Sequence, residues 1–232
     1  MHHIGTLSPA AAPRDYSKVV IRAEVRHPVV TLALVIVNIA IWAIMSGPSE
    51  QDARALVNDY AFFPERMWQS IANQDYSAIT AEALRSVSSL FVHERDYLHV
   101  APNMLLLFLF GRSVERRLGR LRFGILYLLS GALSCAAYGA IVHDGGASFG
   151  ASSAVCGVLG AFVVLFIRRR PFVSMLPLAV LGLNMYCAVN ITAAGFTFFA
   201  HLIGSTIGFL CACCMIVQLT PQATTVRAGA RG

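Results

Sequence analysis

The amino-acid sequence predicts an all-α membrane protein with six transmembrane helices and a long outer loop between the first and second helices. Three observations predict this fold class: the composition, six apolar segments, and the distribution of basic residues between those segments. Hydrophobic residues make up 56% of the 232 residues and charged residues only 13%, with a mean hydropathy of +0.64. Soluble domains contain about 25% charged residues, so this chain lacks the polar groups to cover a soluble surface. Intrinsic disorder is excluded as well, because it requires low hydrophobicity and high net charge.

The apolar segments each approach the roughly 20 residues that a helix needs to cross the hydrocarbon. They are 28–46, 98–115, 121–142, 150–167, 172–193 and 197–219. The first segment is not expected to be a cleaved signal, because it is as long as a full span and no small-residue cleavage site follows it. All six are too long and too uniformly apolar to be barrel strands, so we expect helices.

The basic residues lie almost entirely in alternate connections between the spans. If the six spans alternate in direction, 14 of the 18 lie on one side. These are Arg14, Lys18, Arg22, Arg26, Arg112, Arg116, Arg117, Arg120, Arg122, Arg168, Arg169, Arg170, Arg227 and Arg231. By the positive-inside rule both termini are predicted to be cytoplasmic, and a bacterial cytoplasmic membrane suits this architecture best. The net charge of +6 therefore needs no nucleic-acid partner to explain it.

The predicted organisation is a cytoplasmic N-terminal arm (1–27), a membrane domain (28–219) and a cytoplasmic tail (220–232). The outer loop 47–97 has four arginines against eight acidic residues, a net charge of −4. It is too long for a plain connector and mixes large apolar with polar residues. Amphipathic helices lying in the outer membrane interface would suit this mixture. A small folded cap in the aqueous space is the alternative, and we favour the interfacial interpretation.

The six cysteines lie in apolar stretches and have neither the spacing of a secreted disulfide framework nor that of a zinc site. They are Cys135, Cys156, Cys187, Cys211, Cys213 and Cys214. We interpret them as small packing residues, and we expect no metal.

Polar residues inside the predicted spans are few, and in hydrocarbon such residues mark candidate functional sites. His99 and Asn103 open the second span four residues apart, so they share one helix face. Ser152 opens the fourth span and His201 lies near the start of the sixth. Spans two, four and six run in the same direction, and a rise of 1.5 Å per residue places these groups at one depth, roughly 20 to 25 Å above the cytoplasmic ends.

A serine and a histidine at one depth can act as a nucleophile and its general base, because the hydroxyl is a weak nucleophile until an imidazole takes its proton. Glu115 and Asp144 are the only acidic residues after residue 96, and both flank spans. Ser152 and His201 would therefore form a dyad instead of a triad. The shared depth suits a polar transport pathway equally well, and each residue alone could simply be a packing or hydrogen-bonded structural residue.

Groups around this pair suggest supporting roles. Asn103 and His99 can donate hydrogen bonds, and with the N–H groups that begin the fourth span they would stabilise an oxyanion. Glycines four apart let helices approach closely, and this would bring the fourth and sixth spans together. The glycines expected at that contact are Gly204 and Gly208 on the sixth span, facing Gly150 and Gly157 on the fourth.

Four motifs, in order and on the predicted spans, resemble those of the rhomboid intramembrane serine proteases. They read His99-Val-Ala-Pro-Asn103, Gly111-Arg-Ser-Val-Glu115-Arg-Arg-Leu-Gly119, Gly150-Ala-Ser152-Ser153, and His201-Leu-Ile-Gly204 followed by Gly208. Arg85 and His93 in the long loop also match family positions. The resemblance covers 28–219.

The resemblance implies a rhomboid-like six-helix bundle whose short fourth helix is central. It also implies a water-accessible cavity that is open to the outer side of the membrane. It implies an intramembrane serine endopeptidase that cuts transmembrane protein substrates in the lipid bilayer near their outer end. Ser152 would be the nucleophile, His201 the base, and Asn103 with His99 part of the oxyanion hole. The fifth span and the loop before the sixth would form a lateral gate. No cofactor is implied.

Three positions depart from the family pattern, although none removes a catalytic group. Ser153 replaces the glycine after the nucleophile, Cys156 stands where many relatives place an aromatic residue, and Leu84 replaces a tryptophan. These departures affect the expected rate and substrate preference more than the reaction. Two alternatives are a weak or inactive rhomboid-like protein that binds transmembrane clients, and a small-molecule transporter, for which internal repeats would be expected.

Overall fold

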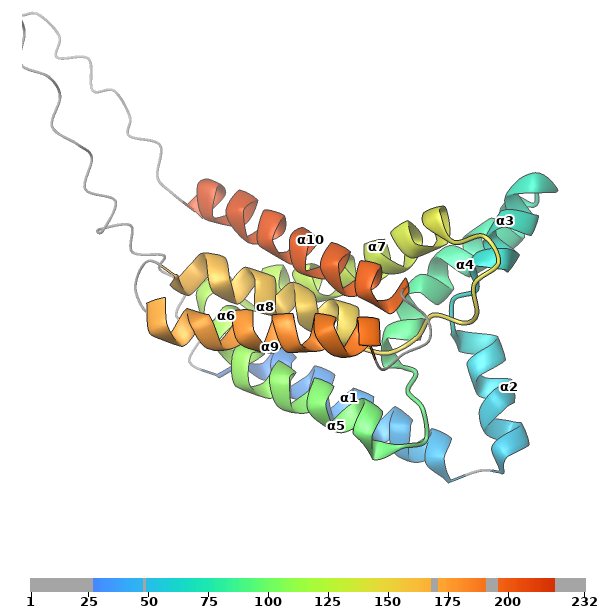
Figure 1. Ribbon diagram of the computed structural model, residues 1–232, viewed down its shortest axis with the longest axis horizontal. Helices are drawn as coiled ribbons and strands as arrows, with labels where there is room; N and C mark the ends of the chain where they lie inside the picture. Colours follow the sequence, from blue (N-terminus) through green and yellow to red (C-terminus); the bar gives the residue numbers. More distant parts are fainter. Residues whose placement is uncertain (1–26, 48, 168–170, 191–195, 220–232) are drawn as a thin grey trace, which may run out of the picture.

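A computed structural model of the protein describes residues 27–47, 49–167, 171–190 and 196–219 (Figure 1). In chain order the bundle contains α1 (Val29–Ser46), the run α5 (Tyr97–Leu106), η3 (Leu107–Gly111) and α6 (Arg112–Leu118), then α7 (Arg120–Ile141), α8 (Ser152–Phe166), α9 (Pro171–Asn190) and α10 (Phe196–Leu219). Each of the six predicted segments coincides with one of these helical segments, so the fold class is confirmed. By length and composition alone, α1, α7 and α10 are long and apolar enough to cross a membrane. The predicted arm, apart from His27, and the tail 220–232 lie outside the described residues.

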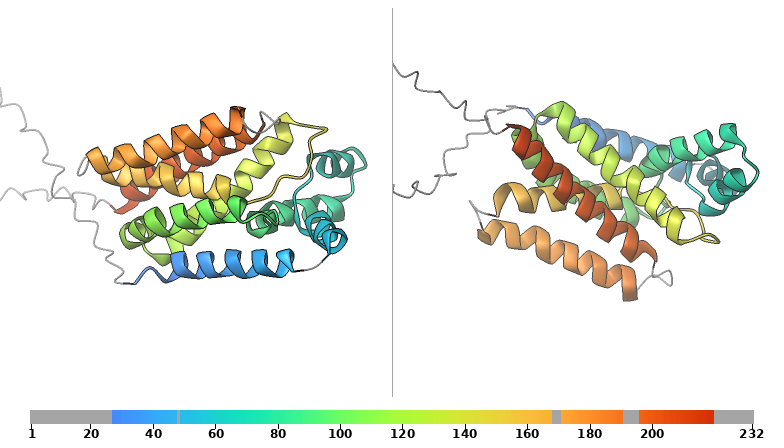
Figure 2. Two further views of the ribbon diagram at one scale, coloured as in Figure 1. Left: turned by 60° about the horizontal axis from the view of Figure 1, so that its bottom comes forward. Right: turned by 90° about the horizontal axis from the view of Figure 1, so that it is seen from above.

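Helix α8 lies at the centre of the bundle, between α7, α9 and α10 (Figures 1 and 2). Most of its residues are buried, including Val155, Val158, Leu159 and Phe162. A helix that is apolar on all sides must be covered by protein or by lipid, and α7, α9 and α10 cover this one. The surrounding helices therefore position the residue at the start of α8, Ser152.

The contact between α8 and α10 is made largely of backbone, and we call it the glycine seam (Gly157 and Gly160 of α8, Gly204 and Gly208 of α10). A Cβ atom on Gly208 would overlap the backbone of Gly157, and one on Gly160 would overlap the carbonyl of Ser205. The helices thus pack at a separation that larger side chains would prevent.

Gly150 does not belong to this seam, contrary to the sequence prediction. The chain at Gly150 has φ of +112°, and α8 begins only at Ser152. A side chain at Gly150 would meet the His99 ring. Gly150 therefore forms the left-handed turn into α8, a backbone conformation that favours glycine, and Gly160 occupies the seam position that the prediction missed.

The second membrane segment is longer than the predicted 98–115. It begins at Tyr97, where the Asp96 carboxylate accepts a hydrogen bond from the Leu98 N–H at 2.9 Å, and continues to Leu118. Pro102 therefore lies inside this helix, beyond its first turn. The helix includes three of the arginines that were assigned to the loop, Arg112, Arg116 and Arg117, and the last two lie in its last turn, where basic side chains are favourable.

Glu115 is fully buried and caps the beginning of α1. Its Oε1 accepts a hydrogen bond from the Val30 N–H at 3.0 Å, and its Oε2 accepts from the Thr31 N–H and hydroxyl, both at 2.7 Å. The first N–H groups of a helix have no partner within the helix, and a carboxylate there is stabilised by the helix dipole. Glu115 thus joins α1 to α6, a role that its position beside a span did not reveal.

Residues 50–91 form a cap of four short elements at the end of the bundle where α1 ends (Figure 1). They are α2 (Glu50–Tyr60), α3 (Pro64–Ala72), α4 (Tyr76–Ser88) and η2 (Ser89–Phe91). The indole N–H of Trp68 donates to the Gly139 carbonyl of α7 at 2.7 Å. A β-bridge joins Phe62 to Ser148, with N–H to O distances of 3.2 and 2.8 Å. The amphipathic helices expected in the loop are present and fold onto the bundle; their place in the membrane interface stays a prediction.

Candidate active site

The structure brings Ser152 and His201 into direct contact. The Nε2 atom of His201 lies 2.7 Å from the Oγ atom of Ser152. Ser152 is the first residue of α8, and His201 lies in the second turn of α10. The glycine seam begins at the next turn, where a Cβ on Gly204 would overlap the Ser153 carbonyl. The close approach of the two helix backbones therefore sets the distance between the hydroxyl and the imidazole.

The imidazole of His201 is almost fully buried, with 5% of its surface exposed. In the part of the chain that the structure describes, its Nδ1 atom has no hydrogen-bond partner. When Nδ1 carries the proton, Nε2 is free to accept the serine proton. The hydroxyl and the imidazole are thus placed for proton transfer, and among the described residues no carboxylate orients the imidazole.

Both side chains line a cavity of about 190 Å³. The other residues around it are Cys135, Tyr138, Gly146, Ala147, Ser148, Phe149, Gly150, Ser153 and Ala200. The wall thus combines α7, the turn before α8 and the start of α10. The hydroxyl and the imidazole face this cavity instead of packed side chains, so a small polar group could reach them.

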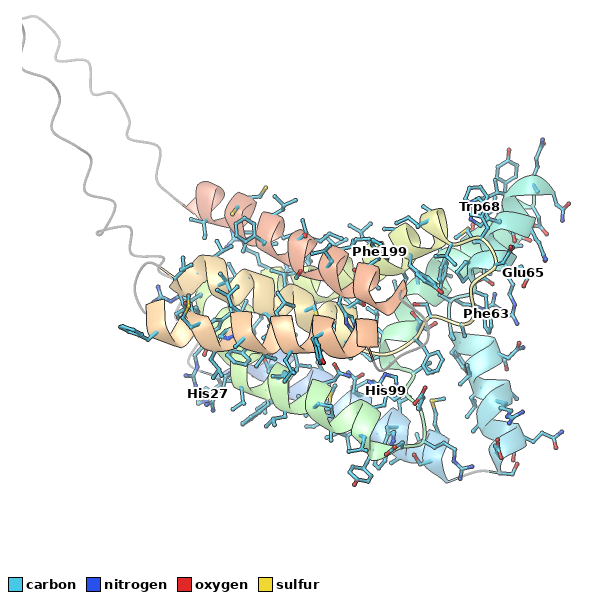
Figure 3. The ribbon with its side chains drawn as sticks, in the orientation of Figure 1. His27, Phe63, Glu65, Trp68, His99 and Phe199 are labelled. Carbon is cyan, nitrogen blue, oxygen red and sulfur yellow. The ribbon has the colours of Figure 1, made fainter. Side chains whose placement is uncertain are left out.

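His99 and Asn103 lie beside this cavity but do not line it. The Asn103 amide donates to the His99 carbonyl of its own helix at 2.8 Å, and the His99 Nδ1 accepts from the Glu94 N–H at 3.2 Å. The His99 ring packs behind the Gly150 turn, at the bundle end that carries the cap (Figure 3). The first N–H groups of α8 have no acceptor within the helix and a partial positive charge, so they could donate to an oxyanion beside the serine.

His93 supports the turn that precedes the serine. It is buried, with 1% exposed, and its Nε2 accepts from the Ala151 N–H at 3.4 Å while its Nδ1 lies 3.3 Å from the Phe91 carbonyl. Burial, together with the neighbouring His99, lowers the pKa of His93 to about 4. The ring is therefore neutral near pH 7 and can accept the Ala151 N–H. In the sequence only the family motif drew attention to this histidine.

Several residues of the cavity had no signal in the sequence. Cys135 and Tyr138 lie in the middle and last turns of an apolar helix, and Ser148 lies in a connecting loop. The Cys135 thiol lies 3.6 Å from the Ser89 hydroxyl and 3.8 Å from that of Ser148. Among the described residues, no three His, Cys, Asp or Glu side chains are grouped to hold a metal ion.

Comparison with known proteins adds independent information. A family model described as the Rhomboid domain matches residues 80–218. The chain is 31% identical over 150 residues to Rhomboid-type serine protease 2 of Emericella nidulans, covering 62% of this chain and 29% of that protein. It is 28% identical over 198 residues to RHOMBOID-like protein 1 of Arabidopsis thaliana, covering 77% of this chain and 51% of that protein.

A third relative has a different name. The chain is 25% identical over 146 residues to Inactive rhomboid protein 1 of Drosophila melanogaster, covering 62% of this chain and 10% of that protein. The chain thus spans at most about half the length of these three relatives. All three come from eukaryotes, which gives no support to the bacterial membrane expected from the sequence.

Proposed function

The chain belongs to the rhomboid family of integral membrane proteins, and from this premise we propose that it is an intramembrane serine endopeptidase. Its substrates would be transmembrane proteins, cleaved near the outer boundary of the bilayer by a dyad of Ser152 and His201. The observation that carries the proposal is the 2.7 Å separation of the hydroxyl oxygen and the imidazole nitrogen, within the range that proton transfer requires. The polar cavity in front of the pair supports it.

The reaction follows from these positions. The Ser152 oxygen attacks the carbonyl carbon of the substrate peptide while His201 Nε2 takes the hydroxyl proton. Negative charge develops on the carbonyl oxygen, where the first N–H groups of α8 would stabilise it. Asn103 and His99, which do not line the cavity, would have to turn toward it to contribute. The imidazolium then gives its proton to the leaving amine, and an acyl-enzyme remains. Water, activated by the same imidazole, hydrolyses the acyl-enzyme and restores the serine.

The neighbouring Ser153 offers a matched test of this assignment. Both serines line the cavity, but the hydrogen bond to His201 is made by Ser152. In proteoliposomes with a model transmembrane substrate, Ser152→Ala should lower the cleavage rate by at least about 10³-fold. Ser153→Ala should keep most of the activity. A fluorophosphonate probe should label the wild type and Ser153→Ala but not Ser152→Ala. Undiminished cleavage by correctly inserted Ser152→Ala would refute the mechanism.

A second candidate function is a rhomboid-like protein that binds transmembrane clients without cleaving them. The likeness to a relative named as inactive favours including it. Both the serine and the histidine are present here, which ranks this function lower. It predicts client capture with no cleavage and no probe labelling by the wild type. A small-molecule transporter ranks lower still, and a flux assay on the same liposomes would detect it.

The proposal keeps both termini on the cytoplasmic side, as the basic residues indicate. It also keeps α9 and the connection before α10 as the lateral gate for substrates, although residues 191–195 lie outside the described part of the chain. Accessibility of a single introduced cysteine near each terminus to a membrane-impermeant reagent would test the orientation.

A further inference from the structure

A second cavity lies between the end of α1 and the cap, and Ser152 is not among the residues that line it. It has a volume of about 420 Å³ and is lined by Ile44 and Met45 of α1, Leu56 and Tyr60 of α2, and Phe91 and Val92 beyond α4. The hydroxyl of Ser88 in its wall donates to the Tyr60 carbonyl at 2.8 Å, so it presents no free hydrogen. In Figure 1, α2 crosses the end of α1 instead of lying along it. We call this cavity the α1–α2 groove.

The groove is open to an apolar environment. Ile44 is 66% exposed and Tyr60 is 52% exposed, while Met45 and Val92 at its base are buried. Exposed apolar side chains continue along α1 through Ile36 and Ile39. Because α1 crosses the membrane, this exposed face lies against lipid chains, and the groove continues it at the boundary of the bilayer.

Arg95 lies near one end of the groove, although it is not among the residues that line it. The Arg95 guanidinium donates through Nη2 to the Ser46 carbonyl at 3.1 Å, directly after Met45 in the chain. Two ion pairs lie among the described residues of the cap, Arg54 with Glu50 and Arg85 with Glu82, and Arg95 belongs to neither. The two residues beside Arg95 are acidic, Glu94 and Asp96. A cation therefore lies at the end of a hydrocarbon slot, with anionic groups next to it.

We propose that the α1–α2 groove binds one zwitterionic phospholipid, with an acyl chain in the slot and the phosphate on Arg95. An acyl chain has no polar groups to leave unsatisfied in a hydrocarbon wall, whereas a peptide has. An α-helix is about 10 Å wide and rises 5.4 Å per turn, so only about one turn would fit in this volume. The groove therefore cannot hold a transmembrane helix. The net charge of −4 on residues 47–97 disfavours an anionic headgroup. The ammonium of a zwitterion, in contrast, complements Glu94 and Asp96.

Native mass spectrometry of the full chain in detergent tests this proposal. The protein is titrated with dioleoyl phosphatidylcholine and, separately, with dioleoylglycerol, which has the same chains but no phosphate. The wild type should retain one phosphatidylcholine per chain and bind it about tenfold more tightly than dioleoylglycerol, because a charge-assisted hydrogen bond contributes about that factor. Arg95→Gln should abolish this preference. Arg54→Gln, on the exposed side of α2, is its matched control and should keep it.

A second pair of variants tests the slot itself. Leu56→Trp fills the groove and should abolish retention of both lipids, whereas Leu121→Trp, at a position 76% exposed on α7, should not. Equal retention of both lipids by the wild type and Arg95→Gln would overturn the phosphate contact. Undiminished retention by folded Leu56→Trp would overturn the site. A wild-type mass of two chains that Leu56→Trp reduces to one would instead identify the groove as an interface between copies. Arg95 lies in an exposed loop, so its variant is informative even where Leu56→Trp fails to fold.

Discussion

The contact between α8 and α10 in the glycine seam differs in kind from the contact between the cap and the bundle. In the seam, α8 and α10 meet backbone to backbone, and Gly157, Gly204 and Gly208 leave no space for a single added carbon. The cap is attached by separate polar contacts, such as the Trp68 indole on Gly139 and the bridge from Phe62 to Ser148. It also encloses a groove of about 420 Å³ beside α1.

This difference indicates where precision is needed. The seam lies one turn from the contact of Ser152 with His201, so a shift of one helix against the other changes that distance directly. The Trp68 contact lies at the last turn of α7, and its loss should leave the axes of α8 and α10 in place. The Phe62 bridge, in contrast, holds Ser148 in the cavity wall. We therefore expect substitutions in the seam to affect both stability and catalysis, and substitutions in the cap to affect mainly stability.

Among substitutions in the seam and the cap, the largest effect is expected from Gly208→Ala. Its methyl group would overlap the backbone of Gly157, which cannot rotate away. Forcing extra volume into a packed contact costs about 1 to 3 kcal/mol, and a backbone obstacle places this variant at the upper end. Separation of the helices should also reduce cleavage at least tenfold. Denaturant unfolding in detergent and the proteoliposome assay would measure the two effects.

The control is Gly182→Ala on α9, where an added Cβ would meet nothing within 4 Å. This change should be neutral or slightly stabilising, because alanine is the better helix former by about 1 kcal/mol. Wild-type stability and cleavage in Gly208→Ala would show that the seam tolerates expansion and would remove the proposed contrast with the cap.

The seam and the six helices were accessible from sequence because they depend on local patterns. Long apolar runs gave α1 and α7 to within one residue, and glycines four apart indicated the face of α10 that contacts α8. Positions that depend on distant partners were not accessible. Glu115 binds the start of α1, 84 residues earlier in the chain, and no local pattern indicates that. Gly150 was assigned to the fourth span because nothing in the sequence revealed its positive φ. The helix α8 begins two residues later, at Ser152.

The candidate pair was predicted from the shared depth of the two residues and from the family motifs. Helices of known rise place side chains along the membrane normal. Rotation about each helix axis is not encoded in that way. Asn103 and His99 were predicted beside the pair, but the Asn103 amide bonds to the backbone of its own helix and the His99 ring packs on the Gly150 turn. The polar contacts of the cap could not be predicted either, because the acceptor of the Trp68 N–H lies 71 residues further along the chain.

An intermediate effect is expected at His93, where the loop after the cap reaches the turn before Ser152. Its pKa of about 4 is below the ordinary value of 6.5. Between these two pH values the unfolded chain binds the proton and the native protein does not, so stability decreases as the pH falls through this range. From pH 7 to pH 5 the loss attributable to His93 is about 2 kcal/mol.

His93→Gln keeps an acceptor for the Ala151 N–H without a titrating group in this range. Its unfolding free energy should therefore depend less steeply on pH than that of the wild type. Parallel pH profiles for the two proteins would contradict the assignment of this dependence to His93.

The smallest effect is expected from Trp68→Phe in the cap. The substitution keeps an aromatic ring beside His143, whose centroid lies 4.2 Å from that of Trp68, but removes the donor to the Gly139 carbonyl. That carbonyl belongs to the last turn of α7 and lacks a partner within the helix, so the loss should be about 1 kcal/mol in unfolding free energy. The cleavage rate should stay within about twofold of wild type, because the seam and not the cap sets the distance from Ser152 to His201. The contrary outcome is a fall in cleavage as large as that of Gly208→Ala, measured at equal folded fraction. It would mean that the cap positions the dyad through the loop that Phe62 holds. The cap and the seam would then act as one unit.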